Sequence, residues 1–231
     1  MALEVSPNSK FIAKSVKKLV PHADLNLTTN ESMSVLHLAA LTQNCEVVEI
    51  LVESGCDVNA VNLFGNTALQ EALLADERED ALAKTGAVLS KLISSSKINL
   101  NNQNKIGKSV AHLMAIKNRA LFLDVFIKTG KLDLNLFDNQ GKTALVDALQ
   151  YGSVDAANIL AKHMKITDPV LLEYCENQDR KIEEELVKIL LKNYQRNNVD
   201  LVGLRGKSTS NLSSKSIRTI NEFIYASKNF D

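Results

Sequence analysis

Residues 203–209 are the part of this sequence that comes nearest to a ligand-binding motif. They read GLRGKST, with a lysine and two hydroxyl residues after the second glycine, as in a loop that binds phosphate. Such a loop has four residues between its glycines, whereas only two separate Gly203 from Gly206. We therefore interpret the segment as a basic turn before a terminal helix, and expect no bound nucleotide.

The histidines and cysteines are not spaced for catalysis or metal binding. The cysteines, Cys45, Cys56 and Cys175, are odd in number and lack both a CxxC motif and a nearby histidine pair. Neither a zinc site nor a disulfide framework is therefore predicted, and small buried thiols in a reducing compartment are the simpler interpretation. No nucleophile and base follow a recognisable spacing. We expect no catalytic residue, no metal and no cofactor, so the chain is not predicted to be an enzyme.

Composition and charge narrow the class of partner. The chain has 231 residues, 45% of them hydrophobic and 23% charged, which is enough apolar surface for a folded core. Lys plus Arg and Asp plus Glu both number 27, so a nucleic-acid partner held by concentrated positive charge is not expected. No apolar run approaches the roughly 18 residues that span a bilayer, and no secretory signal is visible. These observations predict a cytoplasmic monomer without membrane insertion, with the nucleus or delivery into a host cell as alternatives.

A short motif recurs along the chain at nearly constant spacing. Its four copies begin at residues 24 (DLN), 57 (DVN), 99 (NLN) and 133 (DLN), so that consecutive copies are 33, 42 and 34 residues apart. Glycines followed by Thr or Ser two residues later stand at 65, 107 and 141, with the same spacings of 42 and 34. One repeat is therefore about 33 residues long, and the second full repeat carries about nine more.

Within each repeat the pattern predicts a turn, a helix, a loop and a second helix. Apolar residues at helical spacing in 36–41 and 47–53 indicate the two helices, and Gly55 marks the end of the second. Residues 62–65 supply turn chemistry. A unit of this kind cannot bury its apolar face alone, so neighbouring units must stack into a solenoid with a continuous core.

The motifs of residues 34–40 (SVLHLAA) and 46–60 (EVVEILVESGCDVNA) closely resemble the ankyrin-repeat family. The resemblance implies an all-α repeat fold, an ankyrin-type solenoid of helix-turn-helix repeats with projecting turns. It also implies that His37 and His112 form hydrogen bonds between a helix start and the neighbouring turn. The sequence departs from the family pattern at Ser32, which replaces the turn glycine, and at Gln70, where the pattern prefers His or Leu.

We expect one elongated domain over residues 1–231. Residues 11–26 are predicted to be a partial repeat or an N-terminal cap, followed by repeats at 27–59, 60–101, 102–135 and 136–167. A degenerate repeat is expected at 168–200 and a C-terminal cap at 201–231. The charged residues 77–80 fall within the extra length of the second full repeat, and are interpreted as a solvated helix extension or, less simply, as a docking point.

The family leaves certain positions free to vary for recognition, at the turn tips and along the first helices. In this sequence the resemblance places a largely apolar set there: Leu41, Leu63, Phe64, Leu74, Ile106, Ile116 and Tyr151. Four lysines surround the set: Lys105, Lys108, Lys117 and Lys142. Exposed apolar patches with aromatic anchors usually mark interaction sites, although Leu74 and Ile116 are equally compatible with packing inside the array.

These positions predict a non-enzymatic protein-interaction module, or scaffold, that binds an apolar and acidic peptide or protein in a concave groove. The alternative is a targeting or regulatory ankyrin domain of a larger catalytic or effector protein, such as a bacterial effector. Fold alone does not identify the partner, because one repeat architecture serves many functions.

Overall fold

The computed structural model describes residues 7–75 and 81–164, together with six separate residues. These six are Glu184, Lys188, Leu191, Lys192, Arg218 and Thr219. The predicted charge run at 77–80, the basic turn at 203–209 and Cys175 lie outside the described residues. The degenerate repeat expected at 168–200 and the cap expected at 201–231 lie outside the continuous stretches.

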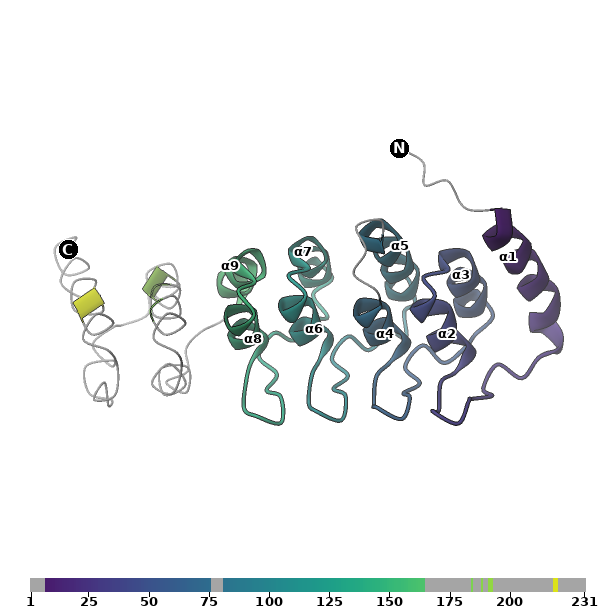
Figure 1. Ribbon diagram of the computed structural model, residues 1–231, viewed down its shortest axis with the longest axis horizontal. Coiled ribbons are helices and arrows are strands. Elements are labelled where there is room, and N and C mark those ends of the chain that lie inside the picture. Colours follow the sequence, from purple (N-terminus) through teal and green to yellow (C-terminus); the bar gives the residue numbers. More distant parts are fainter. Residues whose placement is uncertain are drawn as a thin grey trace.

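In the described residues, pairs of antiparallel helices follow one another in a row, with long turns projecting to one side (Figure 1). The elements in chain order are α1 (Pro7–Leu19), the 3-10 turn η1 (Val20–His22), α2 (Val35–Leu41), α3 (Cys45–Glu53), α4 (Ala68–Leu74), α5 (Ala81–Ile93), α6 (Val110–Ile116), α7 (Ala120–Lys128), α8 (Ala144–Gln150) and α9 (Val154–His163). We call α2, α4, α6 and α8 the first helices, and α3, α5, α7 and α9 the second helices. The described β structure is limited to two isolated bridges, Thr28 with Ser34 and Val61 with Thr67, at the base of projecting turns.

Each first helix is preceded by a Ser or Thr, and at α2 and α4 the hydroxyl satisfies a helix amide that has no partner of its own. Ser34 precedes α2 and Thr67 precedes α4, and each side chain accepts a hydrogen bond from the amide three residues ahead. His37 and Gln70 return the bond to the cap residue and complete a capping box. The expected helix start is therefore confirmed, with Gln70 taking the place of the histidine.

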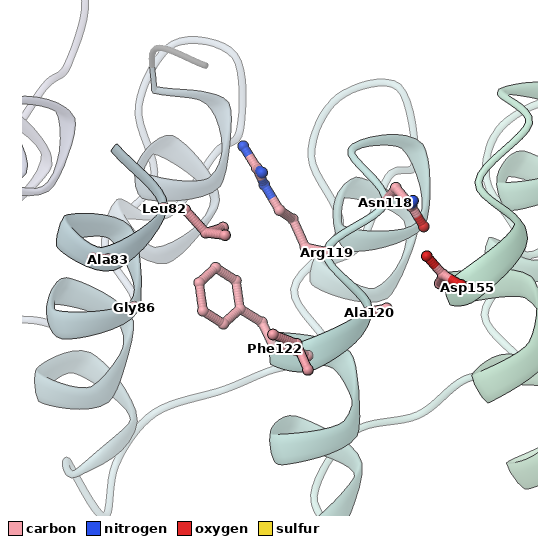
Figure 2. A pocket seen from close by; sticks show the side chains of 9 residues that line it. Leu82, Ala83, Gly86, Asn118, Arg119, Ala120, Phe122 and Asp155 are labelled. Carbon is pink, nitrogen blue, oxygen red and sulfur yellow. The ribbon is translucent and has the colours of Figure 1, made fainter. Parts of the chain in front are cut away.

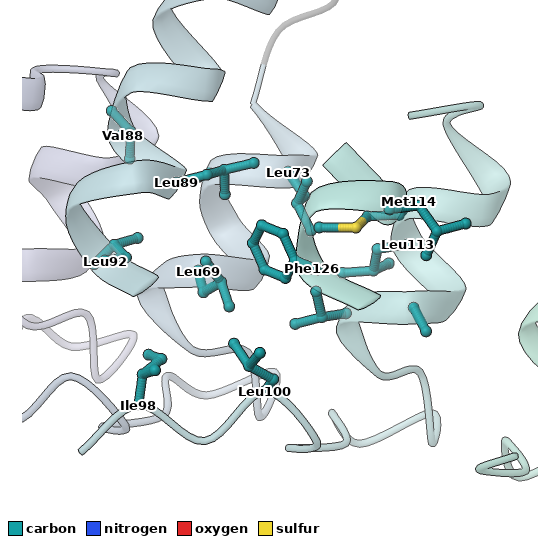
Figure 3. Close-up of a cluster of buried hydrophobic side chains, with 14 of the residues drawn as sticks. Leu69, Leu73, Val88, Leu89, Leu92, Ile98, Leu100, Leu113, Met114 and Phe126 are labelled. Carbon is teal, nitrogen blue, oxygen red and sulfur yellow. The ribbon is translucent and has the colours of Figure 1, made fainter. Parts of the chain in front are cut away.

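The second helices bury one face in a constant register. Val47, Val48 and Leu51 of α3 are buried, and so are Val88, Leu89 and Leu92 of α5. The shared spacing of i, i+1 and i+4 covers one side of a helix. Together with residues of the first helices they form a continuous core, part of which Figure 3 shows around Leu69 and Phe126.

The first described helix packs as a second helix without a first. As predicted from residues 11–20, α1 is helical, and it packs against α3 at one end of the row (Figure 1). The other departure from regularity is α5, which has 13 residues where α3 and α7 have nine. Part of the extra length in the second full repeat is therefore a longer second helix.

At two of the repeat exits, the recurring asparagine joins its repeat to the next one. Asn59 Nδ2 donates to the carbonyl of Lys97 at 2.8 Å, and Asn59 Oδ1 accepts from the amide of Asn99 at 2.8 Å. Asn101 makes the same pair of bonds to the backbone of Lys131 and Asp133. The asparagine of the motif that reveals the period in the sequence thus also helps to fix the spacing between neighbouring repeats.

Candidate functional site

One polar side chain at its base closes each projecting turn. In the turn of residues 61–67, Asn62 Oδ1 accepts hydrogen bonds from the amides of Phe64 and Asn66, both at 3.0 Å. Such a side chain supplies the acceptor that a second strand would otherwise provide. The side chains that do the same in the other turns are those of Thr29, Asn104 and Asp138.

Consecutive turn tips are also bonded to one another. The amide of Leu63 donates to the Glu31 carbonyl at 2.9 Å, and the amide of Lys105 donates to the Phe64 carbonyl at 3.0 Å. The amide of Asn139 continues the series by donating to the Ile106 carbonyl at 3.2 Å. The four tips therefore form one bonded row in which side chains project from a fixed backbone.

Close approach between tips depends on a glycine at the turn. Gly107 has φ +80°, and a Cβ there would lie 2.4 Å from the Asn139 amide nitrogen. A side chain at this position would therefore push the next tip away. In the first tip Ser32 adopts the same left-handed conformation, with φ 58°, although it has a side chain. The turn geometry thus persists at the position where the family pattern is broken.

The tips carry apolar side chains into solvent. Phe64 is 59% exposed, Ile106 61% and Leu63 50%. We call these three residues with Lys105, which is also exposed, the tip row. Large apolar groups held in water on a rigid backbone contribute little to the core of the array, and they form the kind of surface that partners cover.

The remaining predicted apolar residues form a second line, at the C-terminal ends of first helices. Leu41, Leu74 and Ile116 are the last residues of α2, α4 and α6, and Tyr151 follows α8. Leu41, Leu74 and Tyr151 are exposed, whereas Ile116 is half-buried. We call these four residues the helix-end row. A first helix of seven residues, about 10 Å long, separates each turn from the helix-end residue that follows it.

The predicted lysines differ in what they contact. Lys105 is exposed on the tip row, and Lys117 is half-buried at the end of α6. Lys142 Nζ donates to Gln150 Oε1 at 2.9 Å. The role of these lysines in partner binding stays a prediction.

Lys108 faces into the array and not toward a partner. Its Nζ lies 2.6 Å from a carboxylate oxygen of Asp138 and 2.6 Å from one of Asp147, and both carboxylates are almost fully buried. Burial acts to lower the pKa of Lys108, but the two carboxylates outweigh it, so the pKa is raised. Burial likewise acts to raise the pKa of Asp138, but Lys108 and the amides of Lys142 and Gln140 hold it below its usual value. Lys108 therefore links the turn of one repeat to the next turn and first helix.

The two histidines at the third position of their helices have the predicted structural role. His37 Nε2 lies 2.9 Å from the Asn66 carbonyl, and His112 Nε2 lies 2.9 Å from the Lys142 carbonyl. Gln70 makes the equivalent bond, donating from Nε2 to the Lys108 carbonyl at 2.9 Å. Each of these first helices is thereby attached to the turn of the following repeat. Both imidazoles are fully buried.

The fourth repeat lacks this attachment. Val146 stands at the histidine position of α8, and the buried Thr143 hydroxyl at the helix start has no hydrogen-bond partner among the described residues.

Sequence reasoning missed two apolar features. Leu38 is exposed on α2, one turn before Leu41, at the position that Glu71 and Asp147 occupy in α4 and α8. The second feature is a pocket between α5 and α7 (Figure 2). No local pattern indicates it, because its lining residues come from different repeats and include Asp155 of α9.

The described residues contain no group of three or more His, Cys, Asp or Glu placed to hold a metal ion. Cys56 is buried, and burial, followed by the charge of Asp57, raises the pKa of its thiol. Within the described part of the chain, none of the helices combines the length and apolar character needed to cross a bilayer.

Comparison with protein families decides what this arrangement is. The family model for ankyrin repeats in many copies matches residues 19–72, and the model for ankyrin repeats in three copies matches residues 80–170. The chain belongs to the ankyrin-repeat family. The predicted family and the predicted all-α repeat fold are thereby confirmed.

Three curated ankyrin-containing relatives illustrate the similarity. The chain is 30% identical over 154 residues to the nuclear factor NF-kappa-B p105 subunit of Gallus gallus. It is 26% identical over 161 residues to the poly [ADP-ribose] polymerase tankyrase of Caenorhabditis elegans, and 42% identical over 50 residues to the NF-kappa-B inhibitor alpha of Gallus gallus. These alignments cover 64%, 63% and 22% of this chain, respectively. They cover only 15%, 7% and 16% of the relatives, so the chain spans a small part of the proteins it matches.

Ankyrin repeats are interaction modules that do not themselves carry out catalysis. The repeated turns and first helices described above follow that architecture. The protein is accordingly a protein-interaction module.

Proposed function

We propose that the protein binds an apolar, acidic peptide or protein segment across the tip row and the helix-end row. The observation that carries this proposal is the exposure of Leu63, Phe64 and Ile106 on tips that are bonded to one another. When a partner covers these side chains, the array loses little conformational entropy, because its backbone is already ordered.

Charge supports the acidic character of the partner. Lys105 lies between Phe64 and Ile106 in the row, so a carboxylate beside the apolar segment would meet a cation there. Lys108 is not included in the proposed contact, because its ammonium is already bound by Asp138 and Asp147.

The test begins with capture of partners by the isolated chain, followed by affinity measurement with wild type and Phe64→Ala. We expect Phe64→Ala to weaken binding about tenfold or more, which corresponds to about 1.4 kcal/mol or more. The melting temperature should stay nearly unchanged, whereas Leu51→Ala in the core should cost ~2–5 kcal/mol of stability.

Leu19→Ala is the matched control, because it truncates an exposed apolar residue on α1, outside both rows. Equal affinity of Phe64→Ala and Leu19→Ala for a confirmed partner would place the binding surface elsewhere. A large loss of stability in Phe64→Ala would show that the side chain serves the fold and not a partner.

A second candidate function is that of a targeting or regulatory ankyrin domain within a larger catalytic or effector protein. It is supported by the short share of each relative that the chain covers, since in those proteins the matched region is one part among others. We would test it by measuring the size of the native protein in its source with an antibody raised against this chain. A native band at the 25.4 kDa of the chain would argue against it.

We further propose that the chain is a cytoplasmic monomer with no catalytic activity of its own. Sedimentation of the purified chain and localisation of a tagged copy test the first two properties.

A further inference from the structure

A pocket of about 570 Å³ opens between the N-terminal halves of α5 and α7 (Figure 2). Leu82, Ala83 and Gly86 of α5 line one wall, and Leu121 and Phe122 of α7 line the other. The volume falls within the range of ligand-binding pockets in proteins. The pocket lies in the row of second helices and does not involve the residues of the tip row or the helix-end row.

The pocket exists because two second helices that follow one another in the row are not closely packed. α3 packs against α1 and α5, and α7 packs against α9, whereas α5 and α7 are not among the closely packed pairs. The buried apolar residues of α5, which are Val88, Leu89 and Leu92, lie in its second half. The first halves of the two helices therefore leave space between them.

Phe122 shows that this space interrupts an otherwise regular core. It occupies the first position of the i, i+1, i+4 register in α7, where Val47 of α3, Val88 of α5 and Ala156 of α9 are buried. Phe122 is nonetheless only partly buried and lines the pocket. Its ring lies close to Gly86 of α5, where a Cβ would be 3.1 Å from Phe122 Cε1 and would require the ring to shift by a few tenths of an ångström. An aromatic ring at a core position is thus left partly in water.

The rim of the pocket adds the cation of Arg119, the carboxylate of Asp155 on the α9 side, away from Leu82, and further apolar surface. Figure 2 shows the side chain of Arg119 extending beside the opening, on the same side as Leu82. This side chain makes no hydrogen bond or ion pair in the described structure. Leu121, which is 76% exposed, and Val125 lie one turn apart on α7 and extend the apolar surface out of the pocket.

We propose that the α5/α7 pocket is a second docking site, which takes a partner peptide carrying a large apolar side chain next to a carboxylate. The apolar side chain enters between Leu82 and Phe122 and completes the interrupted core. The carboxylate pairs with Arg119, whose planar guanidinium binds carboxylates in a bidentate manner. The apolar surface of Leu121 and Val125 favours a peptide chain as occupant, because a chain continues beyond the pocket.

The experiment is a selection of random 12-residue peptides displayed on phage against the immobilised chain, with depletion on an Ala83→Trp variant whose pocket is filled. We expect the recovered peptides to share a large apolar residue adjacent to Asp or Glu. Their affinity for Ala83→Trp and for Arg119→Glu should be at least about tenfold lower than for wild type. Selection on Arg119→Glu should instead recover peptides with Lys or Arg next to the apolar residue.

Two matched variants show whether the peptides bind in this pocket or at another surface of the array. Ser90→Trp adds the same ring to an exposed position on α5 outside the pocket, and Lys14→Glu reverses an exposed charge on α1. Both should bind the selected peptides as wild type does, and so should Phe64→Ala. Circular dichroism melts check that each variant is folded.

Several outcomes would overturn the proposal. These are the recovery of no peptide, recovery of peptides without the paired apolar and acidic residues, and equal loss of affinity in Ser90→Trp. Loss of binding in Phe64→Ala would assign the peptides to the tip row and so would support the first proposed function at the expense of this one.

Discussion

His37, Gln70 and His112 make the same bonds with two different kinds of side chain. Each sits three residues after a hydroxyl cap, bonds back to that cap and reaches a carbonyl in the next repeat. The imidazole of His112 differs from the amide of Gln70 in one property, which is that it titrates. Burial lowers the pKa of His112, and the opposing bond to the Lys142 carbonyl does not offset it.

The first prediction follows from that difference and concerns His112→Gln. The unfolded chain binds a proton at His112 below a pH of about 6.5, while the folded chain keeps this imidazole neutral to a lower pH, so protonation favours unfolding. The free energy of unfolding should therefore fall as the pH decreases through 6.5, by up to about 1.4 kcal/mol per pH unit from this residue. His112→Gln should keep the bonds, as Gln70 does, and remove this part of the dependence.

Urea unfolding of both proteins at pH 7.5 and pH 5.5 is the measurement. Wild type should lose on the order of 1 kcal/mol more than the variant between the two pH values. The carboxylates and the cation near His112, which are Asp138, Asp147 and Lys108, are present in both proteins and so largely cancel. If wild type and His112→Gln lost the same free energy of unfolding between the two pH values, His112 would be protonated equally in the folded and unfolded chain.

At the scale of the element, the projecting turn is held by its neighbours as well as by its own bonds. Gly107 and Gly55 share a left-handed backbone, with φ of +80° and +84°, but only Gly107 lies against another tip. A Cβ at Gly55 would meet no atom within 4 Å.

The second prediction compares alanine at these two glycines. Both substitutions carry the cost of a left-handed alanine, about 1–2 kcal/mol. Gly107→Ala should cost clearly more, because its methyl group would collide with the Asn139 backbone and break the bond between two tips. Chemical denaturation of the two variants gives the difference. Equal losses would show that the tips separate without cost.

Sequence periodicity was sufficient to predict the helices, but it was insufficient to predict which side chains contact one another between repeats. The apolar spacing predicted α2 and α3, and residues 11–20 predicted α1, because helix periodicity is a local property of the chain. Lys108 looked like a free rim charge because its partners Asp138 and Asp147 lie in another repeat. The same limit applies to the α5/α7 pocket, whose width depends on how two repeats stack. The local sequence pattern therefore predicted the residues of the tip row, but not that the nearby Lys108 is already bonded to two carboxylates.

At the scale of the whole molecule, the close helix contacts among the described residues join each repeat to the repeats beside it, and the helix pairs follow one another in a row (Figure 1). Such a chain is longer than a compact domain with the same number of residues. The third prediction is a radius of gyration from small-angle X-ray scattering clearly above the roughly 17 Å expected of a compact domain of this length. A value at or below 17 Å would contradict an extended array.

The gap between α5 and α7 also bears on how the protein unfolds. In a linear array, cooperativity passes from one unit to the next through their shared interface, so a weak interface lets the two sides melt separately. Amide hydrogen exchange should therefore resolve two blocks with different opening free energies, one containing α3 and α5 and the other containing α7 and α9. A peptide seated between them would couple the blocks, and exchange in both would slow together.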